Sequence, residues 1–258
     1  MRIMFLNQSP RNPRGDAVHE RTQALLRGYA SPGTELDLCY PDEFEGARVM
    51  RAMGAQSVLT GLHHAMATAA LIRKTVWAQD SGYDAVIQSN TFDPGVEAGR
   101  LAVRIPVIGI LRTALHVATN LADKVGITVP LAGHVPYTWR IIRSYGMQDF
   151  VTDIRPVEMY GEDMDARKDQ LFRAAVDTMT ALVAETNPQC IIPLGGALIP
   201  YVVSPSDLQR EVGIPVLNTK AIAIGFAEMC VRNGMSHSPV TYPSAPLRSE
   251  DFAAHAYD

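Results

Sequence analysis

The chain has 258 residues, of which 47% are hydrophobic and 19% charged, and its formal net charge is −4 at pH 7. This composition is typical of a globular protein with one large or two small cores, and it excludes a disordered chain. The slightly acidic balance argues against nucleic acid or an anionic membrane as the main partner.

The sequence contains no apolar run of the 18 residues that a membrane-spanning helix needs. The first apolar segment, residues 1–6, is too short for a signal peptide and is expected to form a strand. Cys39, Cys190 and Cys230 are scattered and form no CxxC pair, which favours a reducing, cytoplasmic location and gives no disulfide framework. The seven histidines show no HExxH pattern, so we expect no metal site.

Strand-like and helix-like patterns alternate along the chain. Strands are expected over residues 2–6, 35–39, 84–88, 105–110, 125–129, 150–157, 190–194 and 214–217. Helices are expected over residues 16–29, 48–78, 95–103, 112–122, 134–145, 163–186, 204–211 and 220–233, followed by an irregular tail from Ser236. Pro156 makes the strand over 150–157 an edge or terminal strand.

This alternation with short connections predicts an α/β fold with mostly parallel sheets, covered on both faces. Residues 84–95 and 190–197 each run from an apolar strand into a loop of small residues, and each is followed by an Ile-Pro-Val segment. The echo indicates two similar doubly wound lobes with parallel sheets and an active-site cleft between them. We expect one lobe to consist of residues 1–111 and 217–258, and the other of residues 112–216.

Loops at the carboxyl ends of parallel strands are where open α/β sheets bind ligands. Asp93-Pro94 is expected to start a helix, with Asp93 as the N-cap, and a helix N-terminus favours anions. No P-loop or GxGxxG motif is present, because Gly195-Gly196 lacks the further spaced glycine, so no nucleotide cofactor is expected.

Four polar residues in the expected strand-end loops are candidate ligand contacts. Asn90 and Thr91 could hydrogen-bond a carboxylate, a carbonyl or an imide, or could satisfy backbone groups of their own loop. Asn7 and Ser9, after the first strand, carry the same expectation, with a turn and a cap as the alternative.

In the second half, Gly195 and Gly196 could leave room for a substrate and offer N–H donors to a developing oxyanion, which is compatible with a tight turn. His134 and Tyr137 follow the loop over 130–133, and either could act as an acid or base, because histidine titrates near neutral pH. The alternative for His134 is a helix-start residue without chemistry.

Three cationic residues complete the candidates. Arg112 and His116 lie four residues apart on one helix face. Arg112 would favour a carboxylate-bearing substrate, with a surface ion pair as the alternative. Lys220 follows the last expected strand and either faces the cleft or is a solvated lysine at a helix start.

The chain resembles the aspartate/glutamate/hydantoin racemase superfamily, and within it the hydantoin and allantoin racemase branch, over nearly its whole length. The segment from Asp84 to Gly95 is its most specific match. The other matching segments are residues 2–7, 143–147, 194–195, 234–236 and 242–243, together with the Ile-Pro-Val echo.

The resemblance implies an enzyme without cofactor or metal, in which two cysteines, one per lobe, face each other across the substrate. One thiol would remove a proton from carbon and the other would return it on the opposite face. In this sequence Asn90 stands at the first thiol position, and Gly196 or Gly195 stands at the second. Cys190 lies several residues earlier, within a strand, and is expected to be a core thiol.

The leading hypothesis is therefore a cofactor-independent enzyme that binds a small carboxylate, hydantoin or imide. Neither nucleic acid nor a membrane is expected as a partner. Without the two thiols, lyase, hydrolase or non-thiol isomerase chemistry would use Asn90, His134 or Tyr137. The alternatives are a hydantoin-type racemase with another acid/base pair and a ligand-binding pseudoenzyme. The sequence identifies neither the substrate nor the reaction, and it leaves a homo-oligomer open.

Overall fold

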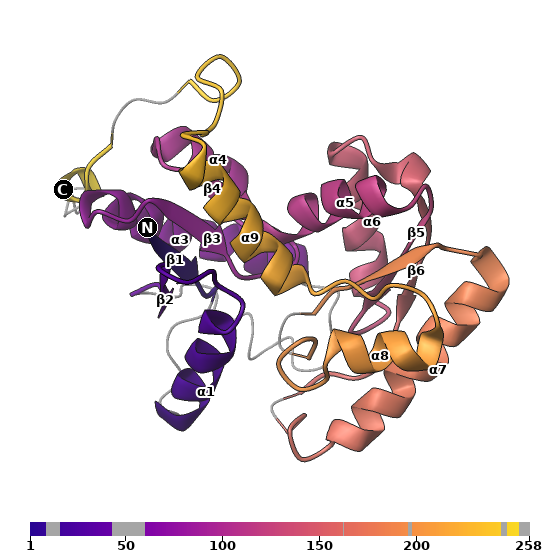
Figure 1. Ribbon diagram of the computed structural model, residues 1–258. Helices are drawn as coiled ribbons and strands as arrows, with labels where there is room; N and C mark the ends of the chain where they lie inside the picture. The colour runs from indigo at the N-terminus through magenta and orange to yellow at the C-terminus, as the bar shows by residue number, and fades with distance from the viewer. Residues whose placement is uncertain (9–15, 43–59, 162, 196–197, 244–246, 253–258) are drawn as a thin grey trace. The chain divides into compact units, whose positions relative to one another are not determined.

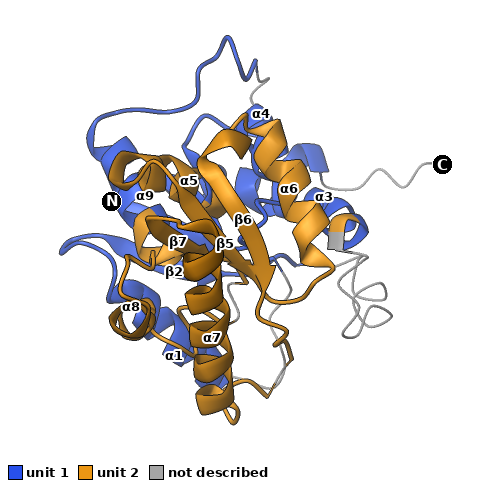
Figure 2. Ribbon diagram, turned by 90° about the vertical axis from the view of Figure 1, so that its right-hand side faces the viewer, with its two compact units in different colours: residues 1–48, 62–109, 223–258 blue, residues 49–61, 110–222 orange. Residues whose placement is uncertain are grey.

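The computed structural model describes residues 1–8, 16–42, 60–161, 163–195, 198–243 and 247–252 (Figure 1). The chain divides into two compact units, which are coloured separately in Figure 2. Unit 1 consists of Met1–Arg48, Leu62–Gly109 and Ala223–Asp258, and unit 2 consists of Val49–Gly61 and Ile110–Ile222. None of the described helices is long and apolar enough to span a membrane.

Unit 1 is built on a parallel sheet of four strands in the order β2-β1-β3-β4. The strands are β1 (Arg2–Leu6), β2 (Glu35–Cys39), β3 (Ala85–Gln88) and β4 (Val107–Gly109). The helices that lie wholly or mostly in this unit are α1 (Asp16–Arg27), α3 (Thr60–Asp80), α4 (Val96–Ala102), α9 (Thr219–Arg232) and η3 (Ser249–Phe252).

The two central strands of unit 1 are apolar over residues 3–6 and 85–87, which are buried, as expected for parallel strands covered on both faces. Since side chains alternate along a strand, Met4 and Leu6 of β1 face the same side as Val86 of β3. There they form one buried cluster with Leu71 of α3. In the parallel pairing of the two strands, Leu6 lies opposite Gln88. The chain segments that follow these strands therefore leave the sheet side by side.

The C-terminal part of unit 1 is held to the rest of that unit by polar contacts. Glu228 of α9 is buried, and its carboxylate accepts hydrogen bonds from the backbone N–H of Ser31 at 2.7 Å and from the Ser31 hydroxyl at 2.6 Å. In the tail, Nε2 of His237 accepts a hydrogen bond from the backbone N–H of Val107 at 2.6 Å. The tail thus satisfies a backbone donor of β4, which is an edge strand.

Unit 2 is built on a parallel sheet of three strands in the order β6-β5-β7. The strands are β5 (Val125–Val129), β6 (Val151–Pro156) and β7 (Cys190–Pro193). The helices are α5 (Ile110–Leu121), α6 (His134–Ser144), η2 (Gln148–Phe150), α7 (Lys168–Thr186) and α8 (Pro205–Val212).

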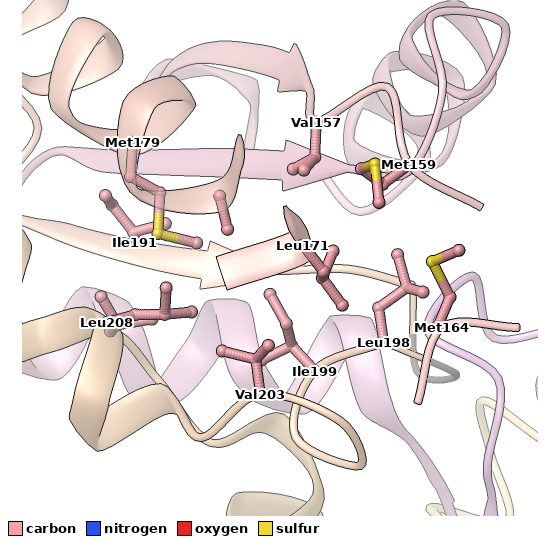
Figure 3. Close-up of a cluster of buried hydrophobic side chains, with 12 residues drawn as sticks. Val157, Met159, Met164, Leu171, Met179, Ile191, Leu198, Ile199, Val203 and Leu208 are labelled. Carbon is pink, nitrogen blue, oxygen red and sulfur yellow. The ribbon is translucent and has the colours of Figure 1, made fainter. Parts of the chain in front are cut away.

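A large core of unit 2 lies where α7 and α8 pack against β7 (Figure 3). Leu171 and Met179 of α7 and Leu208 of α8 are fully buried there, together with Ile191 of β7. Apolar residues at i, i+4 and i+8 of α7 face this core, as an amphipathic helix requires. The packing fixes the carboxyl end of β7, from which the loop with Gly195 departs.

The structure confirms the α/β class and the parallel sheets, and Pro156 lies at the end of an edge strand as expected. Some element bounds differ from the prediction. The strand expected over 214–217 is only an isolated bridge between Ile191 and Val216. The strand expected over 105–110 ends at Gly109, because α5 begins at Ile110. The helix expected over 163–186 begins at Lys168, and residues 48–59 of the helix expected over 48–78 lie outside the described residues.

The prediction that Asp93 is a helix N-cap is wrong. The N-cap of α4 is Gly95, with φ of 73° and no side-chain capping bond. Asp93 lies earlier, in a left-handed conformation with φ of 52°, and is only 7% exposed. Its carboxylate packs against Gly109, where a Cβ atom would come within 2.7 Å of Asp93 Cγ. Asp93 therefore forms a turn ahead of the helix, because close contact with the neighbouring strand end overrides its capping preference.

Candidate functional site

The carboxyl edge of the unit 1 sheet gathers the loops that follow β1 and β3. Two residues beyond the registered pair of Leu6 and Gln88, the side chains of Gln8 and Asn90 meet, and Nδ2 of Asn90 donates a hydrogen bond to Oε1 of Gln8. Oδ1 of Asn90 accepts a hydrogen bond from the backbone N–H of Phe92 at 2.8 Å. Asn90 thus organises its own loop, which is the alternative role considered for it from the sequence, and it stays partly exposed.

Asn7 belongs to the same edge of the sheet. Its Oδ1 accepts hydrogen bonds from the backbone N–H of Gln8 at 2.8 Å and from the hydroxyl of Ser89 at 3.3 Å. Thr91 is 1% exposed, beside Asn90 in the chain. The structure therefore brings Asn7, Asn90 and Thr91 to one strand-end region of unit 1, whereas Ser9 lies outside the described residues.

Sequence analysis missed three polar side chains at this edge. Gln8 is 5% exposed, and its Nε2 lies 2.9 Å from Nε2 of His63, which is 6% exposed in the first turn of α3. Burial lowers the pKa of His63 below the ordinary histidine value, so the ring is neutral at pH 7. Gln88 accepts from the backbone N–H of Asn90 at 2.8 Å, but its own Nε2 is buried without a partner among the described residues.

In unit 2, His134 is the first residue of α6 and is 7% exposed. The backbone N–H of Leu131 donates a hydrogen bond to its Nδ1 at 3.2 Å. Burial lowers the pKa of His134 to about 4. The ring is therefore neutral at pH 7, and because Nδ1 accepts a hydrogen bond, its proton lies on Nε2. His134 is a hydrogen-bond donor held in one tautomer by its own loop.

Tyr137 follows one turn later on the same helix and is partly buried. Its ring packs against Gly61, where a Cβ atom would come within 3.1 Å of Tyr137 Cε2. The hydroxyl of Thr138 donates to the carbonyl of His134 at 2.7 Å, which steadies the first turn of α6. The structure thus presents His134 and Tyr137 on adjacent turns of one helix.

The loop after β7 approaches the loop after β5 very closely. Gly195 has φ of 94°, and a Cβ atom at this position would come within 2.4 Å of Pro130 Cγ. Only glycine fits, both for its backbone conformation and for its contact with Pro130. The Pro130 loop leads into α6, which begins at His134, so Gly195 contacts the loop that precedes His134 at the carboxyl edge of the unit 2 sheet. Gly196 lies outside the described residues.

The remaining basic candidates, Arg112, His116 and Lys220, differ from one another in burial. The guanidinium of Arg112 lies 5.3 Å from the centre of the Tyr145 ring, and His116 is exposed on α5. Lys220 is only 1% exposed, with its ammonium 5.7 Å from the centre of the Tyr201 ring. Lys220 is therefore not the solvated lysine that was the alternative for it.

None of the three thiols has the environment of an activated cysteine. Burial raises the pKa of Cys39 and of Cys230, and it raises the pKa of Cys190 to about 11. Cys190 is fully buried in β7, as expected for a core thiol. Within the described residues no three His, Cys, Asp or Glu side chains are grouped so that they could hold a metal ion.

The sequence profile of the Asp/Glu/Hydantoin racemase family matches residues 15–227. The hydantoin racemase of Pseudomonas sp. (strain NS671) is 24% identical over 198 residues, which cover 77% of this chain and 78% of that protein. The solved structure of the allantoin racemase from Pseudomonas fluorescens covers 96% of this chain and 98% of its own, with a TM-score of 0.80 and 22% identity. The allantoin racemase from Klebsiella pneumoniae has a TM-score of 0.75 at 20% identity, over 96% of this chain and 95% of its own.

Both the fold and the sequence thus place this protein among the racemase-type α/β proteins. The chain belongs to the Asp/Glu/hydantoin racemase family, and its similarity to hydantoin and allantoin racemases supports the branch inferred from the sequence.

Proposed function

We propose that this protein is a cofactor-independent enzyme that isomerises a small hydantoin-like imide, or a related carboxylate, without using a thiol. The observation that carries the proposal is His134, a buried neutral imidazole with its proton on Nε2, at the start of α6, directly after the loop whose Pro130 contacts Gly195. The family membership and the similarity to hydantoin and allantoin racemases support an imide as substrate.

The chemistry requires a group that stabilises negative charge on oxygen. In the isomerisation a base removes the proton from the carbon next to a carbonyl, and the electron pair of the C–H bond moves onto the carbonyl oxygen. Tyr137, once deprotonated, would take up this proton, and reprotonation from water on the opposite face of the carbon completes the inversion. A buried N–H donor aimed at that oxygen stabilises the resulting enolate. A neutral imidazole can act as this donor at pH 7, because it carries one N–H proton. His134 fits this role because its Nδ1 accepts a hydrogen bond from the N–H of Leu131, so the proton of the neutral ring lies on Nε2.

Tyr137 is the second acid/base candidate, since its phenol lies one helical turn from His134. The three cysteines do not suit this chemistry, because burial raises the pKa of each thiol. Lyase and hydrolase reactions also place negative charge on a carbonyl oxygen, so the assay must distinguish all three outcomes.

The test is incubation of the protein in D2O with enantiopure monosubstituted hydantoins, allantoin and small dicarboxylates, followed by proton NMR. Isomerisation replaces the ring C–H by C–D and removes the optical rotation. Hydrolysis gives a ring-opened carbamoyl product, and a lyase reaction shortens or splits the carbon skeleton. Loss of the ring C–H signal without ring opening is the expected result.

The same substitution at two histidines makes the test specific. We expect His134→Asn, whose amide oxygen can still accept from the N–H of Leu131, to lower turnover about 100-fold or more, because it lacks the Nε2–H donor. His116→Asn on α5 is the matched control and should leave turnover unchanged. Full activity of His134→Asn would refute the role of His134, and tight binding without any product would indicate a ligand-binding protein instead.

A further inference from the structure

A chain of hydrogen bonds in unit 1 runs from the backbone of Phe92 through Asn90 and Gln8 to His63. Amide groups and a neutral imidazole can each donate or accept, depending on their orientation or tautomer. The backbone N–H of Phe92 can only donate, however, and it lies 2.8 Å from Oδ1 of Asn90. At the Phe92 end of this hydrogen-bond chain, the direction from donor to acceptor is therefore fixed.

The contact with Phe92 determines which group donates in each of the following hydrogen bonds. Because Oδ1 of Asn90 faces Phe92, Nδ2 of Asn90 faces Gln8 and donates to Oε1. Gln8 then turns its Nε2, which can only donate, toward Nε2 of His63 at 2.9 Å. Nε2 of His63 must accept this hydrogen bond, so the neutral ring carries its proton on Nδ1.

Reversing any one member would oppose like groups. A flipped Gln8 would place its NH2 against the NH2 of Asn90, and a flipped Asn90 would place its NH2 against the N–H of Phe92. Gln8 and His63 are 5% and 6% exposed, so solvent does not readily compensate such a clash. The neighbouring His64 is also buried, with its ring centre 5.4 Å from that of His63.

We propose that His63, as the Nδ1–H tautomer, completes the hydrogen-bond chain from Phe92 at its other end, and that the two ends together hold the Asn90 amide in one orientation, so that the loop after β3 presents hydrogen-bond donors to a carbonyl or carboxylate oxygen of the substrate. His63 is a positioning residue, because it acts through Gln8. The inference deepens the proposed function and rests on it in one respect, that the protein binds a substrate with a carbonyl or carboxylate oxygen.

Two hydrogen-bond donors at the end of β3 and in the loop after it support the binding of a substrate oxygen. Asn90 is partly exposed, and after its bond to Gln8 the second hydrogen on Nδ2 remains for a ligand or solvent. Nε2 of Gln88 is buried, 3% exposed, and has no acceptor among the described residues. Leaving a buried donor unpaired is costly, and an oxygen of the substrate is the group that would satisfy it.

The first experiment reads the tautomer directly, in the full-length protein without ligand. Two-bond nitrogen–proton correlation spectra of nitrogen-labelled protein at neutral pH distinguish Nδ1–H, Nε2–H and imidazolium forms. We expect Nδ1–H for His63 and the opposite tautomer, Nε2–H, for His134, which serves as an internal reference. An Nε2–H or imidazolium form of His63 would overturn the inference.

The second experiment replaces the hydrogen-bond acceptor at residue 63 either by another acceptor or by a donor. His63→Gln can still offer an amide oxygen to Gln8, whereas His63→Lys offers only a donor and forces Gln8 to turn. With allantoin and a monosubstituted hydantoin as calorimetric probes, we expect His63→Gln to bind within about threefold of the wild type and His63→Lys to bind at least tenfold more weakly. Equal binding by the two variants, with unchanged circular dichroism, would contradict the inference.

Gln8→Glu covers the case in which His63→Lys does not fold. A carboxylate at this position can accept from Asn90 but cannot donate to His63, so His63 must donate instead and its pKa should rise, visibly in an NMR titration. An unchanged pKa would overturn the inference. If the wild type binds no probe, the proposed function fails, while the spectra still decide whether His63 has the tautomer that the hydrogen-bond chain requires.

Discussion

Gly195 lies so close to Pro130 that a Cβ atom at residue 195 would come within 2.4 Å of Pro130 Cγ. The backbone of Gly195 also has φ of 94°, a conformation that side-chain-bearing residues rarely adopt. Residue 195 is one of the two positions that the family resemblance allots to the second thiol. The local fold therefore leaves no space for a cysteine side chain at residue 195 of this protein.

This contact predicts that Gly195→Ala destabilises the protein by about 2–4 kcal/mol, the sum of backbone strain and overpacking against Pro130. Chemical denaturation measures the loss of unfolding free energy. The control is Gly225→Ala in α9, where a Cβ atom would meet nothing within 4 Å. Alanine is the better helix former, so this variant should be neutral or up to about 1 kcal/mol more stable. Equal effects of the two substitutions would show that the close approach is not a constraint.

The raised pKa values of all three thiols predict an enzyme that does not depend on cysteine. The variant Cys39→Ser/Cys190→Ala/Cys230→Ala should keep turnover within about threefold of the wild type, once corrected for its folded fraction. Iodoacetamide at pH 7 should label the native protein slowly, because the thiolate is the reacting form and burial disfavours it. Rapid labelling coupled to loss of turnover would identify a catalytic thiol and refute the non-thiol mechanism.

Stability should depend on pH through His134. Its pKa is about 4 in the folded state and 6.5 in the unfolded reference, so the unfolded chain binds more protons between these values. The unfolding free energy should therefore fall as the pH decreases from 6.5 to 4, by at most about 3 kcal/mol for this residue. His134→Asn should flatten the slope in that window. An unchanged slope would mean that protonation of His134 is not linked to unfolding.

The tail should stabilise the edge of the unit 1 sheet through His237. His237→Ala removes the acceptor for the N–H of Val107, a residue that is only 2% exposed, and should cost about 1–3 kcal/mol. Hydrogen exchange at the Val107 amide should accelerate accordingly. His237→Gln, which can still offer an acceptor, is the matched variant and should keep most of the protection. Exchange at Val107 that is unaffected by both variants would contradict the contact.

The regular elements could be predicted because their patterns are local. The buried strands at residues 2–6, 85–88, 125–129 and 190–193 are short apolar runs bounded by turn residues, and their hydrophobicity alone identifies them. Element ends were less predictable. Asp93-Pro94 has the sequence of a helix start, but contact with Gly109, which is distant in sequence, holds Asp93 in a left-handed turn.

The candidate site was predicted in part. Asn7, Asn90 and His134 follow strands, so their general location was accessible from the sequence. The roles of Gln8 and His63 were not, because their contact depends on the register between β1 and β3 and on the packing of α3, 55 residues away from Gln8. Nor could the sequence show which tautomer His134 adopts, since the N–H of Leu131 determines it only in the folded loop.

The bond between Glu228 and Ser31 joins residues 197 positions apart within unit 1. During synthesis, unit 1 therefore cannot complete its packing until α9 has left the ribosome, whereas the strands of the unit 2 sheet end at residue 193. We expect the unit 1 strands, which end at residue 109, to emerge first on the nascent chain, but the packing of unit 1 to stay incomplete until its C-terminal helix is made. C-terminal truncations that remove α9 should accordingly be prone to aggregate through unit 1.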